Sequence, residues 1–303
     1  MRFAILFLSL FAGIELRGQP TQADFTVPSS VCLNEQFTIT NQSTNAIGYQ
    51  WDFCAGDLSQ PPQASLLVNN FGGFGIRLEV AEDDGQFFGF IISGGTRNLY
   101  RLNFGSSLTN NPIVTDLGNL GLNSNQLRAI DIVAEDGVYY GFIVDSDKSK
   151  VYRIDFGASL TNTPQNAIEI FSGIPLNTPY QISSVFEGTL KFLFITNFGD
   201  GKMVRLKFNS YAGAVTESYP LSISTNGLNS VSFLKSGNKW HCATVSPLTG
   251  EVLKIDFVNG LDDNSPIVTS IPVLTPISVE LVNENGKFYV FAQSRNPGLS
   301  VFR

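Results

Sequence analysis

The sequence predicts an all-β protein, a β-propeller with one four-stranded blade in each repeat of about 50 residues. The first marker of the repeat is a short strand with a basic residue at its centre. These basic residues, spaced 52, 52 and 49 apart, are Arg101, Arg153, Arg205 and Lys254. The second marker is the glycine of a hairpin turn, whose copies, spaced 52, 51, 49 and 49 apart, are Gly85, Gly137, Gly188, Gly237 and Gly286. Because two markers keep one period, we expect five repeats of the same supersecondary unit.

Residues 130–156 show how one repeat is built. Three runs rich in β-branched and aromatic residues predict strands at 130–133, 139–144 and 151–156. The first two are joined through Asp136-Gly137, a pair that tolerates the positive φ of a tight hairpin turn. A polar loop joins the second strand to the third. The sequence therefore predicts consecutive antiparallel hairpins.

A fourth strand is expected in each of the first four repeats, at 113–117, 167–171, 216–221 and 267–271. The fifth repeat ends after its third strand, at 299–303. A single strand at Ala64–Asn69 stands where a fourth strand would precede repeat one, so we predict that it completes repeat five and closes the ring. The propeller would then span 64–303. The alternative is that these residues are a fragment of a larger propeller.

Composition limits the classes of partner. Only 15% of the 303 residues are charged, and the net charge is −7 with 19 Lys and Arg. Binding to nucleic acid needs a basic surface, and none is visible. The same charge disfavours an anionic membrane surface.

The first 18 residues have the features of a secretory signal peptide. Met1-Arg2 is basic, the run 3–14 is apolar but too short to span a bilayer, and a small residue, Gly18, precedes the expected cleavage point. We therefore expect an exported protein, extracellular or at the cell surface, that does not insert in a membrane after cleavage.

Three cysteines are compatible with export. Cys32 and Cys54 both precede the repeats, so we predict that they form a disulfide. Cys242 lies on a predicted strand among apolar neighbours and is expected to be an inert core residue.

Residues 19–58 carry a recognisable pattern in three segments: Ala23-Asp24-Phe25, Asn41-Gln42-Ser43-Thr44 and Tyr49-Gln50-Trp51-Asp52-Phe53. They resemble the first half of a PKD domain, an immunoglobulin-like sandwich, so we expect a partial PKD-like β module. Its usual continuation is replaced here by Cys54-Ala55-Gly56-Asp57, and its later strands are missing. A module this short buries little core, which gives the predicted disulfide a physical purpose.

The combination of this opening with propeller-like repeats resembles secreted surface proteins of gliding bacteria. Longer members of that group often end in a sorting domain, which this sequence lacks at Arg303. The resemblance implies export and a repeat architecture, and it makes the remainder of a larger surface protein one possible partner. It implies no particular activity.

Several motifs with possible chemistry do not meet their requirements. His241 is the single histidine, and its neighbour Cys242 would point to the opposite face of a strand, so the two cannot act as base and nucleophile. Residues 145–156 lack the glycine and the glutamate of a calcium loop. Gly72-Gly73-Phe74-Gly75 opens no helix, which excludes dinucleotide binding. We expect no cofactor and no metal.

The remaining candidates lie on the inner strands. Arg77 and Arg128 precede inner strands, near the axis where propellers commonly bind ligands, and Glu79 and Asp131 are the acidic residues placed nearest to that axis. We predict these four as ligand-binding residues. The acidic residues of the hairpin turns belong to the repeat and are expected to form turns. The repeated basic residues are expected to lie on a solvated outer face and to pair with acidic neighbours or adjacent blades.

The sequence favours a non-catalytic protein that binds an extracellular protein or glycan. A rigid ring with variable loops suits recognition. The first alternative is a glycan hydrolase or lyase, which requires carboxylates that converge at the channel. The second is a structural spacer of a larger surface protein, which predicts no cavity with converging polar groups.

Overall fold

The computed structural model describes residues 25–26, 40–42, 75–221, 223, 225–284, 287–294 and 300–302. The chain divides into two compact units, Met1–Ser65 and Leu66–Arg303. In the first unit, β1 (Phe25–Thr26) pairs antiparallel with β2 (Thr40–Asn41). The signal segment, the Cys32–Cys54 disulfide, most of the PKD-like module and the strand Ala64–Asn69 lie outside the described residues and stay predictions.

The second unit consists of five antiparallel sheets, each made of strands that are consecutive in the chain. We call them blades one to five. The strands are β3 (Gly75–Asp83), β4 (Gln86–Ser93), β5 (Leu99–Gly105), β6 (Ile113–Asp116), β7 (Leu127–Glu135), β8 (Val138–Asp145), β9 (Lys150–Gly157), β10 (Ile168–Ile170), β11 (Pro179–Glu187), β12 (Leu190–Asn197), β13 (Met203–Phe208), β14 (Glu217–Leu221), β15 (Val231–Ser236), β16 (Lys239–Ser246), β17 (Glu251–Phe257), β18 (Ile267–Pro272), β19 (Pro276–Glu284), β20 (Lys287–Ser294) and β21 (Ser300–Phe302).

Four blades have four strands, and blade five has three described strands. This confirms the all-β prediction and the four-stranded repeat. The hairpin turns also form as expected: Asp136 and Gly137 have φ values of 50° and 77°, and Asp84 and Gly85 have 49° and 71°. Positive φ at both central residues gives the twist that matches two antiparallel strands. The part of the chain that the structure describes contains no helix capable of crossing a membrane.

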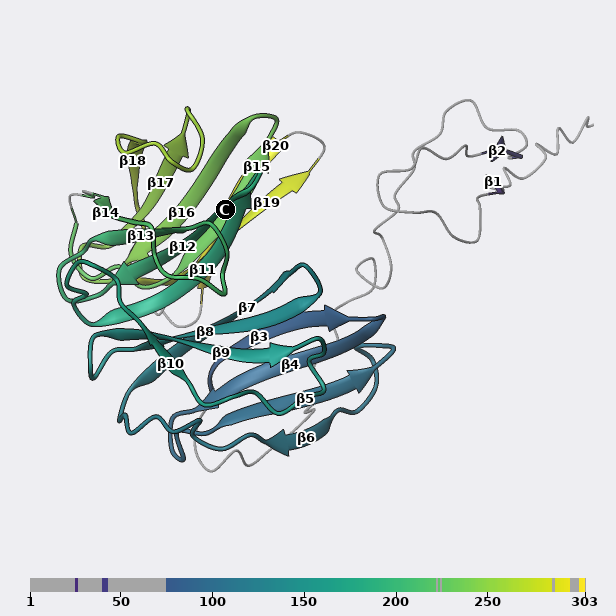
Figure 1. Cartoon of the computed structure of the whole chain (residues 1–303). Helices are drawn as coiled ribbons and strands as arrows, with labels where there is room; N and C mark the ends of the chain where they lie inside the picture. Colours follow the sequence, from purple (N-terminus) through teal and green to yellow (C-terminus); the bar gives the residue numbers. More distant parts are fainter. Residues whose placement is uncertain are drawn as a thin grey trace, which may run out of the picture. The chain divides into compact units, whose positions relative to one another are not determined.

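The first strand of each blade is its inner strand. Contacts run between successive inner strands from β3 through β7, β11 and β15 to β19. Figure 1 shows blades one and two side by side, with β7 next to β3. All five inner strands contribute residues to one cavity, which is the arrangement expected around the axis of a propeller.

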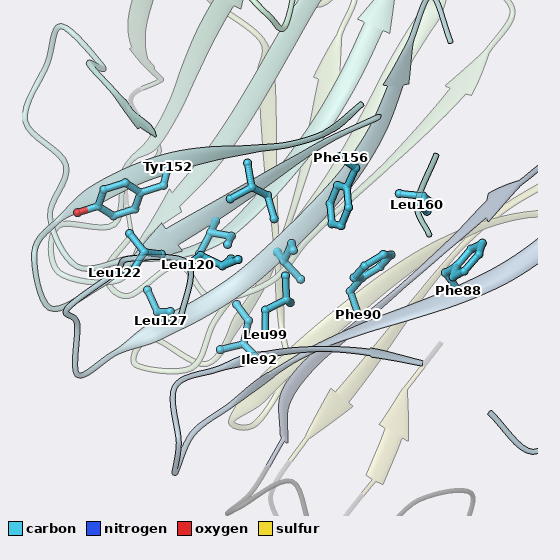
Figure 2. Packing of buried hydrophobic residues seen from close by; sticks show 13 residues of the cluster. Phe88, Phe90, Ile92, Leu99, Leu120, Leu122, Leu127, Tyr152, Phe156 and Leu160 are labelled. Carbon is cyan, nitrogen blue, oxygen red and sulfur yellow. The ribbon is translucent and has the colours of Figure 1, made fainter. Parts of the chain in front are cut away.

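The hydrophobic core lies between blades. At the first junction, Phe88, Phe90 and Ile92 of β4 share one cluster with side chains of blade two and with Leu120 and Leu122 of the connecting segment (Figure 2). The rings of Phe90 and Phe156, from neighbouring blades, lie 5.2 Å apart between centroids. Similar clusters occupy the next three junctions. The alternation of apolar residues along each strand therefore serves to bury one blade face against the next.

A second repeated contact joins neighbouring blades at the first three junctions, and we call it the junction clasp. In the first, Arg101 donates through Nη1 to the carbonyls of Leu160 and Asn162 at 2.7 and 2.8 Å. The carboxylate of Asp83 accepts a hydrogen bond from the Leu160 amide at 2.8 Å. Blade one therefore binds both carbonyl and amide groups of the loop that follows β9 in blade two.

The clasp recurs at the next two junctions. Arg153 donates to the carbonyls of Tyr211 and Ala212, and Arg205 donates to those of Leu261 and Asp263. The matching carboxylates are Glu135, which accepts from the Tyr211 amide, and Glu187, which accepts from the Leu261 amide.

These contacts correct the prediction of a solvated outer face. Arg205 is only 1% exposed, and it donates to two backbone carbonyls and to the side chain of Asn264 in the next blade. It also forms ion pairs with Asp262 and Glu217. The hairpin carboxylates likewise do more than form turns, because Asp83, Glu135 and Glu187 bind the neighbouring loop. The expected pairing is confirmed in both forms. The clasp arginines pair with adjacent blades, and Arg153 and Lys254 pair with their acidic neighbours Asp155 and Asp256.

His241, Cys242 and Asp145, which belong to the motifs rejected above, have structural roles. His241 Nδ1 lies 2.6 Å from Asp256 Oδ1 on the next strand, whereas Cys242 is fully buried in the core. Burial raises the pKa of the Cys242 thiol well above its usual value, so the thiolate is disfavoured. Asp145 is also fully buried and accepts a hydrogen bond from Ser124 Oγ at 2.6 Å.

Candidate functional site

One register position of the inner strands supplies most of the polar groups around the axis. It is the residue that pairs with position 90, 142, 194, 243 or 291 of the adjacent second strand. Its five occupants, in blade order, are Glu79, Asp131, Ser183, Ser232 and Glu280. Because side chains at one register position point the same way in every blade, these five converge on the axis.

All five side chains line a cavity of about 530 Å³. Arg77 also lines it, as do Gln181 and Gln293. The wall is therefore mainly polar, with apolar contributions that include Phe233 and Phe291. A cavity of this size can enclose a few sugar units, and such pockets with a few converging polar groups are the usual form of a ligand site.

Glu79 is the most perturbed carboxyl group of the cavity. Its pKa is raised to about 8, mainly by burial and also by the neighbouring charge of Asp131, while Arg77 opposes the shift. At neutral pH the folded protein therefore holds Glu79 mainly in the protonated form, in which it can donate a proton.

Asp131 is held differently, although it faces the same cavity. Burial raises its pKa to about 6, and hydrogen bonds from Ser184 oppose the increase. The backbone amide of Ser184 donates to Asp131 Oδ2 at 2.8 Å, which links blade two to blade three. This bond favours the charged form, so Asp131 is mainly ionised at neutral pH. Two adjacent carboxyl groups are thus held in different protonation states.

The two predicted arginines lie near one aromatic residue. The guanidinium of Arg128 lies 4.9 Å from the centroid of the Tyr180 ring, and the Tyr180 ring lies 5.5 Å from that of Phe198. Tyr180 also interacts electrostatically with Arg77, whose own pKa is lowered by burial. Arg128 and Tyr180 each sit at a bulge at the start of an inner strand, where an extra residue redirects the side chain.

The structure brings together three of the four predicted site residues in the cavity wall: Arg77, Glu79 and Asp131. Arg128 lies beside them on Tyr180, with its Nε atom buried and unpartnered among the described residues. The carboxyl groups of Glu79 and Asp131 therefore converge on the cavity, as the glycan hydrolase or lyase alternative requires.

Sequence reasoning missed the residues of blades three to five. Glu280 accepts a hydrogen bond from Ser232 Oγ at 3.0 Å, and Ser232 Oγ accepts from the Leu281 amide at 3.1 Å. The repeat period could have found them, because Glu280 lies at the same place in its repeat as Glu79 does in the first. Among the described residues, no group of three or more His, Cys, Asp and Glu side chains could hold a metal ion.

No family model and no curated protein matches the sequence. Solved structures do match the fold. One is a GH43 β-xylosidase/α-arabinofuranosidase from a compost microbial metagenome, in complex with xylotriose, at 12% identity and a TM-score of 0.50 over 75% of this chain and 87% of that one. A second is an α-L-arabinofuranosidase from Lactobacillus brevis, at 12% identity and a TM-score of 0.53 over 72% and 83% of the two chains.

A third is a GH43_1 enzyme from Xanthomonas citri complexed with xylose, at 10% identity and a TM-score of 0.50 over 78% and 88%. At this level of identity, the likeness shows a shared propeller fold.

These findings correct two expectations. The sequence favoured a non-catalytic binding protein and no enzyme activity, whereas the three similar solved structures described above are glycoside hydrolases. The glycan hydrolase, held as an alternative, agrees better with them. A structural spacer was expected to lack a cavity with converging polar groups, and the cavity described above argues against it.

Proposed function

We propose that this protein hydrolyses glycosidic bonds in the cavity around its propeller axis. The observation that carries the proposal is the pair Glu79 and Asp131, two neighbouring carboxyl groups whose environments set their pKa values at about 8 and about 6. Glycoside hydrolysis needs one carboxylic acid and one carboxylate at the same bond, and separated pKa values supply both at neutral pH.

The two groups have complementary roles in this proposal. Glu79 protonates the glycosidic oxygen as the bond to the anomeric carbon breaks. Asp131 takes a proton from the water molecule that attacks the anomeric carbon, so the products are two sugars with free hydroxyl groups. The Ser184 amide orients the Asp131 carboxylate through its 2.8 Å hydrogen bond.

Arg77 and Arg128 would bind the glycan next to these carboxyl groups. A guanidinium presents several donors in one plane, which suits hydroxyl and ring oxygens of a sugar. The unpartnered Nε of Arg128 and the face of the Tyr180 ring lie beside each other and favour this role. The similar solved structures bind xylotriose and xylose, so we infer a pentose-containing glycan as the first substrate to examine.

We infer that this activity takes place outside the cell. The signal-like segment 1–18 supports export, and the resemblance of residues 19–58 to the opening of surface proteins of gliding bacteria supports a location on the cell surface.

The test is hydrolysis of xylo-oligosaccharides and of aryl xylosides and arabinofuranosides by the full chain. We expect Glu79→Gln and Asp131→Asn each to lower kcat by about 100-fold or more, the range of general acid–base catalysis. In the wild type, kcat/KM should rise through about pH 6 as Asp131 ionises and fall through about pH 8 as Glu79 loses its proton.

Glu82→Gln is the matched control, because Glu82 is an exposed carboxylate on the same strand, β3, three positions after Glu79. Its activity should equal that of the wild type. A wild type that cleaves none of these substrates, or a Glu79→Gln variant with full activity, would refute the proposal. An unsaturated product would indicate a lyase instead of a hydrolase.

A further inference from the structure

The inner strand of blade one has an apolar face that the described residues leave uncovered. The relevant residue is Leu78, which pairs with Ile91 of the second strand. At the same register position the other four blades carry Ile130, Ile182, Val231 and Val279, exposed by 1%, 1%, 7% and 5%. Leu78 is 52% exposed, and Val80 on the same face is 45% exposed.

The other junctions show what normally covers this position. The segment that leads from the fourth strand of one blade to the inner strand of the next supplies apolar side chains to the same cluster. Leu120 and Leu122 belong to the cluster of Ile130, Leu176 to that of Ile182, and Leu228 to that of Val231. Val273 packs against the cluster that contains Val279. Burial of the inner-strand residue thus depends on the segment that precedes its blade.

For blade one, the preceding segment is 70–74, and it contains two aromatic residues, Phe71 and Phe74. It follows the sequence 66–69, which reads Leu-Leu-Val-Asn and is part of a predicted strand. The connections between a fourth strand and the next inner strand are three to ten residues long elsewhere in the propeller, so five residues are sufficient. The compact unit that holds the propeller also begins at Leu66.

Blade five provides the place for a strand. It has three described strands where the other blades have four. Its third strand, β21, already pairs with Ala292, Gln293 and Ser294 of β20, so a further strand can be added on the outer side of β21 as in the other blades.

We propose that residues 66–74 of this chain close the ring. Residues 66–69 add to β21 as the fourth strand of blade five, and Phe71 and Phe74 cover Leu78 and Val80 at the start of blade one. The junction between blades five and one is then covered by apolar side chains of the preceding segment, as the other four are. The apolar face of blade one is an internal docking surface for the chain's own N-terminal segment.

Hydrogen–deuterium exchange on the full chain tests this directly. The amides of 66–69 should exchange about tenfold or more slowly than those of an unstructured peptide, because strand pairing protects them. Val68→Pro removes one donor from the strand and should abolish this protection and speed exchange at 300–302. Gln60→Pro, in the linker before the strand, is the control and should change neither.

A side-chain variant tests the apolar contact. Phe71→Asp should lower Tm by about 3 to 8 °C, because it removes an aromatic side chain from an apolar face, whereas Asn70→Asp should leave Tm within about 1 °C. Exchange of 66–69 at the rate of an unstructured peptide in the folded wild type would overturn the proposal. Protection that appears only in a dimer, detected by light scattering at increasing concentration, would assign the face to a second copy and would equally overturn it.

Discussion

At the scale of residues, the cavity shows how one position of a repeated strand acquires different chemistry in each blade. Glu79 and Asp131 occupy the same register position in blades one and two, and serines occupy it in blades three and four. The repeat fixes where these side chains point, while the identity of the residue is free to vary. Glu79 has a neighbouring Asp131 charge and Asp131 has a hydrogen bond from Ser184, and these local partners separate the two pKa values.

The raised pKa of Glu79 has a consequence for stability. The folded protein binds this proton more tightly than the unfolded chain does, so the free energy of unfolding falls as pH rises from about 4.5 to about 8. Glu79→Gln cannot ionise and avoids this loss. We expect the variant to be more stable than the wild type at pH 8 by a few kcal/mol at most, and equal to it near pH 4. Urea unfolding at both pH values measures the difference, and equal stability at pH 8 would contradict the shift.

At the scale of elements, the junction clasp explains why the basic residue of the third strand recurs. Arg101, Arg153 and Arg205 each reach across to two carbonyls of the next blade's loop. A planar guanidinium can bond two such acceptors at once. The period visible in the sequence is therefore the period of a contact between blades. Lys254, at the same register position in blade four, pairs instead with Asp256 of its own strand.

Arg205 and Lys254 provide a matched comparison. Arg205→Met removes the hydrogen bonds of a buried guanidinium to Leu261, Asp263 and Asn264, together with its ion pairs to Asp262 and Glu217. It should lower the free energy of unfolding by about 2 to 4 kcal/mol. Lys254→Met removes a partly exposed ion pair and should cost less than about 1 kcal/mol. Denaturant unfolding of both variants measures the ratio. Equal losses would mean that the clasp contributes no more than a surface ion pair.

At the scale of the whole molecule, stability depends on cores that lie between blades. Cys242 belongs to one of them, packed with Phe194 of the preceding blade and fully buried. Access to its thiol requires the junction between blades three and four to open.

Thiol labelling at Cys242 therefore reports this opening. We expect a maleimide to modify Cys242 at least 100-fold more slowly in the folded protein than in urea, because burial both covers the sulfur and raises the pKa of the thiol. Peptide mapping by mass spectrometry distinguishes Cys242 from Cys32 and Cys54. Rapid labelling of the folded protein would show that this junction opens easily.

The sequence by itself determined the repeat. Asp-Gly turns, alternating strands and a period of about 50 residues are local properties, so blade boundaries and the strand order could be predicted from them. Glu79 and Asp131 could be named as candidates for the same reason, since their place in the repeat put them on inner strands.

Only the tertiary structure decided which groups meet. The pKa of Glu79 depends on Asp131 from another blade, 52 positions later in the sequence, and Asp131 depends in turn on Ser184 of the next. The buried state of Arg205 and the convergence of Glu280 on the cavity also come from contacts between blades. Burial and electrostatic interaction act across space between distant segments, so the composition of one strand does not contain them.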